Sequence, residues 1–412
     1  MRRRTKIAAG LCASVLFFTG CTAAATMSSD PSAAASADTA TSDTATSGAP
    51  TTGTTTTSVA AVADASAEVD WDSLPTTEVT LTDEGLAVTD AGTYVLTGAS
   101  TGQVTVNSDG AVRLVLDGVT INSSSGAAIQ VDGAELTVIE LADGSTNVVS
   151  DAATRADEEI DGAIYSADDL SLTGSGALSV TANFADGIVG KDDLWIESGI
   201  ITVTSVDDAI RGKDSLNISG GAITIDAAGD GMKASNDTDL GKGQLTITGG
   251  DITITTGDDA IKAEQAIGIS GGTIDVVASV EGIEAPVIVI DGGDITVNAS
   301  DDGINASASE IITEGLSITI NGGTLTIVMG QGDTDAIDSN GDLTITGGTI
   351  DITAQSPFDF DGTGTLTGGT ITVNGEQVTE LTNQMMGGGP MGGGGMGGDM
   401  GGGRMGGGRG GR

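Results

Sequence analysis

The sequence of residues 207–232 reads DDAIRGKDSLNISGGAITIDAAGDGM and holds one full copy of a repeat. Ile210 is an apolar residue that stands two positions after an acid, and we call such a residue an anchor. The next anchor is Met232, 22 residues later. Between the anchors, apolar and polar residues alternate around a Gly-Gly pair, which is typical of short strands joined by tight turns. Helix is excluded because the apolar period is two and the turns come too often.

The same motif recurs along the middle of the chain. Its anchors are Ile188, Ile210, Met232, Ile261, Ile283, Ile304 and Ile337, so the steps are 22, 22, 29, 22, 21 and 33 residues. The two long steps are a 22-residue unit with insertions. Three short strands per unit predict an all-β fold: a single-stranded, right-handed parallel β-helix whose rungs stack about 4.8 Å apart. Inward ladders of Ile, Val and Leu then build the core of a chain with two Trp, two Tyr and five Phe.

The composition divides the chain around this solenoid. Residues 1–21 have a basic start, an apolar stretch and small residues before Cys21, which predicts a lipoprotein signal peptide with lipidation at Cys21. Residues 22–68 predict a disordered Ala/Thr/Ser tether, and residues 385–412 predict a disordered Gly/Met/Arg tail. We assign residues 69–160 to an N-terminal cap and first rungs, and residues 161–384 to the regular β-helix. The expected location is the outer face of a membrane, as an exported cell-surface lipoprotein, with ordinary secretion as the alternative.

Acidic residues dominate the chain, with 58 acids against 15 bases and no histidine. The missing histidine excludes Ser-His-Asp and Cys-His catalysis and histidine zinc sites. Between residues 22 and 384 lie all the acids except Asp399, but only eight of the 15 bases. Such a surface repels nucleic acid and anionic membrane, and it either stays heavily solvated or recruits cations. We therefore expect no nucleic-acid partner, and membrane contact only through the N-terminal lipid.

An acid stands two residues before each anchor, and stacked rungs would place these acids in one column: Asp186, Asp208, Asp230, Asp259, Glu281, Asp302 and Asp335. Carboxylates about 4.8 Å apart repel by roughly 3–4 kcal/mol at an effective dielectric near 20. The column is therefore protonated, neutralised by the bases that follow the anchors, or occupied by hard divalent cations. A different interpretation is that each Asp caps its own turn without metal. Calcium is the cation we expect, because it is abundant outside the cell.

Several motifs in register carry a family resemblance: AGTYVLTG (91–98), VRLVLDGVTI (112–121), DDAIRGKDSL (207–216), GDGMKASND (229–237), DDAIKAE (258–264) and DDGINA (301–306). Over about residues 78–375 the chain resembles the bacterial extracellular carbohydrate-binding β-helix proteins. These are a calcium-binding, pectate-lyase-like family associated with cellulose and polygalacturonate binding. The resemblance implies a right-handed β-helix, bound calcium and polysaccharide recognition.

The matching motifs imply roles for individual residues. Calcium ligands would be Asp207, Asp208, Asp230, Asp237, Asp239, Asp258, Asp259, Glu281, Asp301 and Asp302. A uronate carboxylate would meet Arg211, Lys213, Lys233 and Lys262, and sugar hydroxyls would meet Asn305. From the strand pattern, Trp195 lies between inward Leu194 and Ile196, so we expect its ring to point outward, where it either stacks on sugar or covers an edge of the solenoid.

The sequence therefore predicts a surface-anchored, calcium-binding protein that recognises an acidic or cell-wall polysaccharide without turnover and has no catalytic residue. One alternative is a calcium-dependent polysaccharide lyase on uronate polymers, in which Arg211, Lys233 or Lys262 would act as the base. Another alternative is a non-catalytic surface scaffold or adhesin that uses the solenoid as a spacer.

Overall fold

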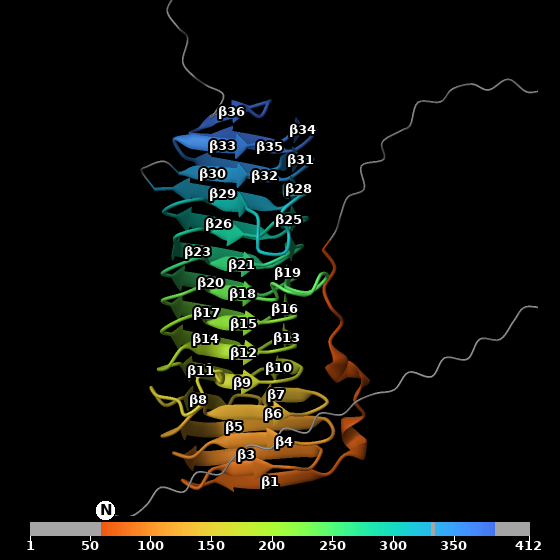
Figure 1. Cartoon of the computed structure of the whole chain (residues 1–412), viewed down its shortest axis with the longest axis vertical. Coiled ribbons are helices and arrows are strands. Elements are labelled where there is room, and N and C mark those ends of the chain that lie inside the picture. Colours follow the sequence, from red (N-terminus) through yellow and green to blue (C-terminus); the bar gives the residue numbers. More distant parts are fainter. Residues whose placement is uncertain (1–58, 331–333, 384–412) are drawn as a thin grey trace, which may run out of the picture. The chain divides into compact units, whose positions relative to one another are not determined.

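A computed structural model of the chain describes residues 59–330 and 334–383. The predicted signal peptide with Cys21, most of the predicted tether and the tail from residue 385 lie outside the described residues. The described chain is a parallel β-helix (Figure 1), which confirms the predicted fold class. Two short 3-10 helices, η1 (Ala65–Glu68) and η2 (Trp71–Ser73), precede the first strand. Neither 59–330 nor 334–383 contains a helix that is long and apolar enough to cross a membrane.

Each regular rung contributes three strands. One strand belongs to a 12-stranded sheet and the other two belong to a 24-stranded sheet. The strands of the 12-stranded sheet are β2 (Leu86–Val88), β4 (Val104–Asn107), β6 (Ile129–Gly133), β9 (Gly162–Ser166), β12 (Asp186–Gly190), β15 (Ile210–Gly212), β18 (Met232–Ala234), β21 (Ile261–Ala263), β24 (Ile283–Glu284), β27 (Ile304–Ala306), β30 (Asp335–Ser339) and β33 (Ser356–Phe360).

The 24-stranded sheet begins with three strands, β1 (Thr76–Leu81), β3 (Gly92–Ser100) and β5 (Val112–Asn122), and then continues as two parallel rows. The first row is β7 (Thr137–Leu141), β10 (Leu170–Gly174), β13 (Asp193–Ile196), β16 (Ser215–Ile218), β19 (Gln244–Ile247), β22 (Ala266–Ile269), β25 (Val287–Ile290), β28 (Ser317–Ile320), β31 (Asp342–Ile345) and β34 (Gly364–Leu366). The second row is β8 (Thr146–Ser150), β11 (Ala177–Thr181), β14 (Ile200–Ser205), β17 (Ala222–Ala227), β20 (Asp251–Thr256), β23 (Thr273–Ser279), β26 (Asp294–Ala299), β29 (Thr324–Met329), β32 (Thr349–Thr353) and β35 (Thr370–Val373). A last strand, β36 (Glu376–Val378), pairs antiparallel with β35.

The strand register confirms the predicted stacking of the anchors. Ile188 pairs with Ile210, Ile210 pairs with Met232, and the pairing continues through every predicted anchor to Ile337. Inward positions of the other sheet stack in the same way, and the resulting ladders are fully buried. The core is therefore a set of parallel aliphatic ladders, which need no large aromatic side chains.

The Gly-Gly pairs form the turns between the two rows of the 24-stranded sheet. Gly250 has φ +99, a conformation that side-chain-bearing residues rarely adopt. A Cβ on its neighbour Gly249 would lie 2.4 Å from the carbonyl oxygen of Ser219 in the rung below. Glycine is required at both positions because one turn needs a left-handed backbone and the rungs approach too closely for a side chain.

The first described residues, 59–73, form a strap along the outside of the first row (Figure 1). Val59 lies against Gly268 of β22, Val62 against Asn217 of β16, and Trp71 against Arg113 of β5. The prediction of a free tether as far as residue 68 is therefore wrong for residues 59–68. Small side chains and a few polar contacts hold this segment on the solenoid.

Candidate functional site

The strand register places one outward residue of each rung in a single column on the 12-stranded sheet. From β9 to β33 this position, one residue after the anchor, holds Tyr165, Val189, Arg211, Lys233, Lys262, Glu284, Asn305, Asp338 and Asp359. The charge changes sign between Lys262 and Glu284. We call the rungs of β9 to β21 the lower half and those of β24 to β33 the upper half. Because the sequence has no Lys or Arg between residues 263 and 403, the described upper half contains no base.

The acids of the lower half bond from rung to rung through backbone N–H groups. Asp186 Oδ1 accepts from the N–H of Asp208 at 3.2 Å, and Asp208 Oδ1 accepts from Asp230 at 2.9 Å. Asp230 Oδ1 then accepts from the N–H of Asp259 at 3.1 Å. Each carboxylate therefore ties its rung to the next one, whereas the capping alternative would have it bond within its own turn.

The remaining oxygens of these acids are paired with the bases of the neighbouring column. The contacts are Arg211 with Asp161 and Asp186, Lys233 with Asp208 at 3.3 Å and Asp230 at 2.7 Å, and Lys262 with Asp259 at 2.6 Å and Glu284 at 2.5 Å. Burial still raises the pKa of Asp186 to about 6, because it outweighs the effect of Arg211. Neutralisation by bases, one of the three ways to relieve the repulsion, therefore operates in the lower half.

The upper half has carboxyl groups without such compensation. Burial, with help from neighbouring carboxylates, raises the pKa of Glu281 to about 8, of Asp338 to about 7 and of Asp302 to about 6. Asp302 Oδ1 accepts from the N–H of Asp335 at 3.0 Å, which continues the rung-to-rung bond. For these acids only protons or cations remain as compensation.

Two groups of three acids have oxygens within 4.8 Å of one another in the part of the chain that the structure describes. They are Asp230 with Asp258 and Asp259, and Asp259 with Glu281 and Glu284. The predicted cluster of Asp230 with Asp237 and Asp239 does not form, because the insertion that carries Asp237 and Asp239 follows β18. At that end of the strand, Asn236 donates to Asp214. Four predicted ligands remain: Asp207 and Asp301 are exposed, and Asp208 and Asp302 form the rung-to-rung bonds described above.

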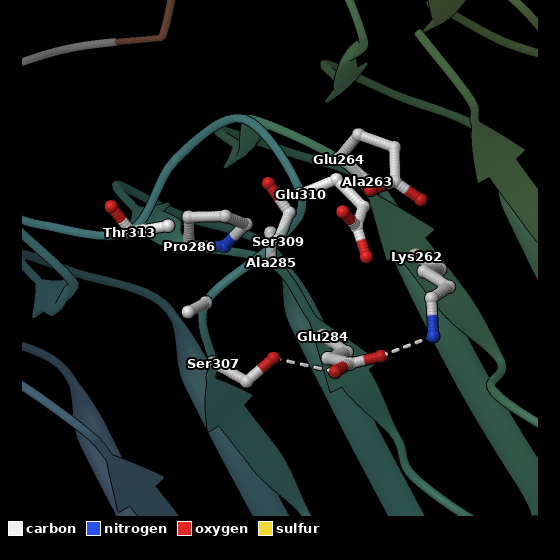
Figure 2. Close-up of a pocket in the computed structure, with 11 residues that line it drawn as sticks. Lys262, Ala263, Glu264, Glu284, Ala285, Pro286, Ser307, Ser309, Glu310 and Thr313 are labelled. Carbon is white, nitrogen blue, oxygen red and sulfur yellow. Dashed lines mark hydrogen bonds and ion pairs between the residues drawn. The ribbon is translucent and has the colours of Figure 1, made fainter. Parts of the chain in front are cut away.

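A pocket of about 380 Å³ lies where the charge of the column changes sign. Figure 2 shows that Lys262 and Ser307 both reach Glu284, whose carboxylate lies between them. Ser307 Oγ donates to Glu284 Oε1 at 2.6 Å, and Glu264 and Glu310 lie above on the rim. Burial raises the pKa of Glu284, but its hydrogen bonds with Lys262, Ser307 and Asp259 together outweigh burial and leave the pKa lowered. Lys262 is thus fully engaged by acids of two rungs.

A second pocket, of about 590 Å³, lies in the lower half and gathers three bases, so we call it the basic pocket. It is lined by Tyr165, Lys191, Arg211 and Lys213, together with two acids and Ser235. Lys191 Nζ lies 5.6 Å from the centre of the Tyr165 ring and 3.2 Å from Asp161 Oδ2. The side chain of Lys213 forms no ion pair or hydrogen bond with any other described residue, so its charge is available to a ligand.

The residues predicted to contact sugar differ in whether the structure leaves them accessible to a ligand. Arg211, Lys233 and Lys262 are committed to carboxylates, and only Lys213 keeps a free charge. Asn305 is 8% exposed, and its Nδ2 donates to Glu281 Oε2 at 3.1 Å, so the prediction of a surface contact to sugar is wrong. Trp195 does point out of the core, but it is 4% exposed because the strap covers it, so it offers no open stacking ring.

Sequence reasoning missed Glu284, Asp338 and Asp359 as members of the column. They stand one residue after an anchor, at the position of Arg211, Lys233 and Lys262, so the repeat itself could have found them. It also missed Asp161, which binds Arg211 and Lys191 from the edge of the pocket. Nothing in the repeat indicates that contact, because Asp161 lies three residues before its anchor and two rungs below Arg211.

Comparisons with known proteins find a matching family and similar chains. The family model of the carbohydrate-binding domain-containing proteins matches residues 82–334 and 267–384. A relative in Acetivibrio thermocellus with the same description is 38% identical over 133 residues, which are 30% of this chain and 46% of the relative. This chain therefore spans about half the length of that curated relative.

A solved structure of a polysaccharide lyase-like protein from C. thermocellum, a gadolinium derivative, is 33% identical to this chain. The match covers 53% of this chain and 92% of the other, with a TM-score of 0.45. Because the family model matches most of the solenoid, the chain belongs to the family of carbohydrate-binding domain-containing proteins.

Proposed function

We propose that the protein is an exported, calcium-binding surface protein that binds an acidic polysaccharide and does not cleave it. The observation that carries this proposal is the free charge of Lys213, beside Lys191 and Tyr165 in the basic pocket. A lysine without a partner amid so many acids is available to a uronate carboxylate. The tyrosine ring next to it offers an apolar face to the sugar.

Calcium is proposed for the upper half, where Glu281, Asp302 and Asp338 have raised pKa values and no described base. Calcium prefers carboxylate and carbonyl oxygens, which these rungs supply. Asn305 adds a buried Oδ1 without a hydrogen-bond partner among the described residues. Such an oxygen is costly to bury unless a cation or a water occupies the site. The ion would bridge the protein to a second carboxylate-bearing chain.

Several observations favour binding over β-elimination. A lyase needs an Arg or Lys that can lose its proton near neutral pH. Burial lowers the pKa of Arg211 and Lys262, but their carboxylate partners outweigh it and raise both above their usual values. Lys233 is raised for the same reason, by Asp230 and Asp208. The three bases that a lyase would use here therefore hold their protons more tightly than free side chains do.

Surface anchoring rests on the sequence of the amino terminus, where Cys21 follows an apolar stretch and would carry the lipid. The strap begins at residue 59, within the predicted tether, so the remaining tether residues, 22–58, would connect the solenoid to the membrane.

The test is to incubate the full chain with polygalacturonate, in calcium and in chelator, and to record both retention and unsaturated product. The proposal expects retention that depends on calcium and no sustained product. Accumulation of unsaturated product that Arg211→Ala abolishes would establish the lyase instead. Failure to retain any glycan in either buffer would favour the scaffold.

A further inference from the structure

The strap covers a column of residues on the first row of the 24-stranded sheet. The strand register aligns this outward column as Ser171, Trp195, Asn217, Thr246, Gly268, Val289, Thr319, Thr344 and Thr365. Ser171, Trp195, Asn217 and Thr246 are 0–5% exposed, whereas Thr319, Thr344 and Thr365, beyond the strap, are only partly buried. The strap therefore hides the only tryptophan of the solenoid.

The contacts of the strap with this column are few, and apart from that of Val59 with Gly268 they are polar. Trp195 Nε1 donates to the carbonyl oxygen of Val62 at 2.9 Å, and the N–H of Val62 donates to Asn217 Oδ1 at 3.0 Å. Asn217 Oδ1 also accepts from Thr246 Oγ1 at 2.8 Å. One backbone unit of the strap thus supplies an acceptor and a donor, the two roles that a sugar hydroxyl also fills.

The covering segment has little to hold it in place. Residues 60–63 are exposed, and all the described strand pairings begin at Thr76 or later, so no ladder joins the strap to the sheet. Segments with few buried apolar contacts open at low free-energy cost. We propose that residues 59–64 are a detachable cover over a second glycan-binding face, in which Trp195 and Asn217 receive a neutral, hydroxyl-rich chain. This inference rests on the proposed function in that the ligand is a polysaccharide, but it uses a different face of the solenoid.

The ligand class follows from the side chains under the cover. An indole for stacking, an amide and two hydroxyls are the groups that bind uncharged sugars. No Lys or Arg stands in the covered stretch of the column from Ser171 to Gly268. The face therefore lacks the positive charge that the basic pocket offers to a uronate.

The carboxyl groups of Asp64 and Glu197 hold the cover on the sheet. Asp64 of the strap accepts from Ser171 Oγ at 3.1 Å and from Ser66, and it shares a hydrogen bond with Glu197, the residue after β13. That hydrogen bond, followed by burial, raises the pKa of Glu197 to about 7. Thr173 is the other polar neighbour of Glu197, and none of the ion pairs in the described residues involves Asp64 or Glu197.

The proton on Glu197 determines how the opening of the cover depends on pH. Below pH 7 the protonated Glu197 donates to Asp64 and holds the cover closed. Above pH 7 both groups are charged and repel each other across the contact. The ratio of open to closed cover rises with pH through the range from about 5 to 7, by at most about tenfold per pH unit.

The test uses the full chain with Trp71→Phe, so that fluorescence reports Trp195 alone. Quenching by acrylamide and hydrogen exchange of residues 59–64 should both increase from pH 5 to pH 8. Glu197→Gln should remove this dependence and keep the cover closed, because the amide donates to Asp64 at every pH. Gly268→Val should open the upper end, since a Cβ there would lie 2.8 Å from Val59 Cβ. Its sheet neighbours Thr246 and Val289 are β-branched, so the strand itself accepts the change.

Binding is then measured with cellohexaose as the probe. Gly268→Val and Asp64→Ala should bind it more tightly than Glu197→Gln, with a change in Trp195 fluorescence, and thermal melting confirms that each variant is folded. The inference is overturned if Trp195 stays shielded at pH 8 and in both opened variants, or if the opened variants bind cellohexaose no better than Glu197→Gln. Polygalacturonate binding is recorded in parallel, because it tests the basic pocket and should be the same in all of these variants.

Discussion

Lys262 joins two rungs: its Nζ lies 2.6 Å from Asp259 of its own rung and 2.5 Å from Glu284 of the rung above. It is the last base before the column becomes acidic. Below it, Asp186, Asp208 and Asp230 each pair with Arg211 or Lys233, whereas the column above Glu284 holds carboxyl groups and no base. This single residue therefore marks the boundary between ion pairing and the need for protons or cations.

Replacing Lys262 by Gln should destabilise the calcium-free protein by about 1–3 kcal/mol, since two carboxylates lose their partner. The loss is smaller than for a fully buried pair, because the Lys262 side chain is 28% exposed. Calcium should restore part of the stability, since Asp259, Glu281 and Glu284 would then form an open acidic group. Denaturant unfolding measures this, with Lys242→Gln, a lysine 48% exposed, as the control. Equal losses in the two variants would contradict the assignment.

Calcium should raise the melting temperature of the full chain, because an ion bound only to the folded state stabilises that state by mass action. At a calcium concentration of 100 times Kd, the free energy of unfolding rises by about 2.7 kcal/mol. Asp302→Asn and Asp338→Asn should each reduce this gain. Asp275→Asn, an exposed acid on β23, should leave it intact. A melting temperature that is the same after exhaustive chelation would show that the upper half holds no structural calcium.

Without calcium, the protein should become more stable as the pH falls from 8 to about 5. The pKa values of Glu281, Asp338 and Asp302 in the folded state are about 8, 7 and 6, above their usual values of 4.5 and 3.8. A raised pKa means that the folded state binds protons more readily than the unfolded state, so stability is lost as pH rises through these values. Thermal melts in chelator should therefore rise by several degrees on acidification. Saturating calcium should flatten the profile, and a flat profile in chelator would contradict the burial of these acids.

The repeat predicted the fold because its period determines which residues of successive rungs stack on one another. Once Ile210 and Met232 are equivalent, the strands, the Gly-Gly turns and the column of acids follow. The site was only partly predictable. The repeat register places Lys233 above Arg211. The acid with which each base forms an ion pair depends on the side-chain conformations across several rungs, which the repeat does not specify. Arg211, for example, reaches down to Asp161.

The strap could not be predicted, for a different physical reason. Residues 59–64 are Ala, Val and Asp, with no periodicity and little apolar surface, so composition alone favours a tether. Their place is set by Trp195, Asn217 and Gly268, which lie 133, 155 and 209 residues further along the chain than the strap residues they contact. Contacts over such a separation leave no local signal in the sequence, and so the burial of Trp195 was missed as well.

The central claim is that the free charge of Lys213 binds an acidic polysaccharide, and a calorimetric titration with polygalacturonate tests it most directly. With calcium held constant, Lys213→Glu should weaken binding by about tenfold or more, the equivalent of about 1.4 kcal/mol for one charged contact. Lys242→Gln, outside the pocket, should bind like the unmodified chain. Equal affinity in Lys213→Glu and the unmodified chain would contradict the claim.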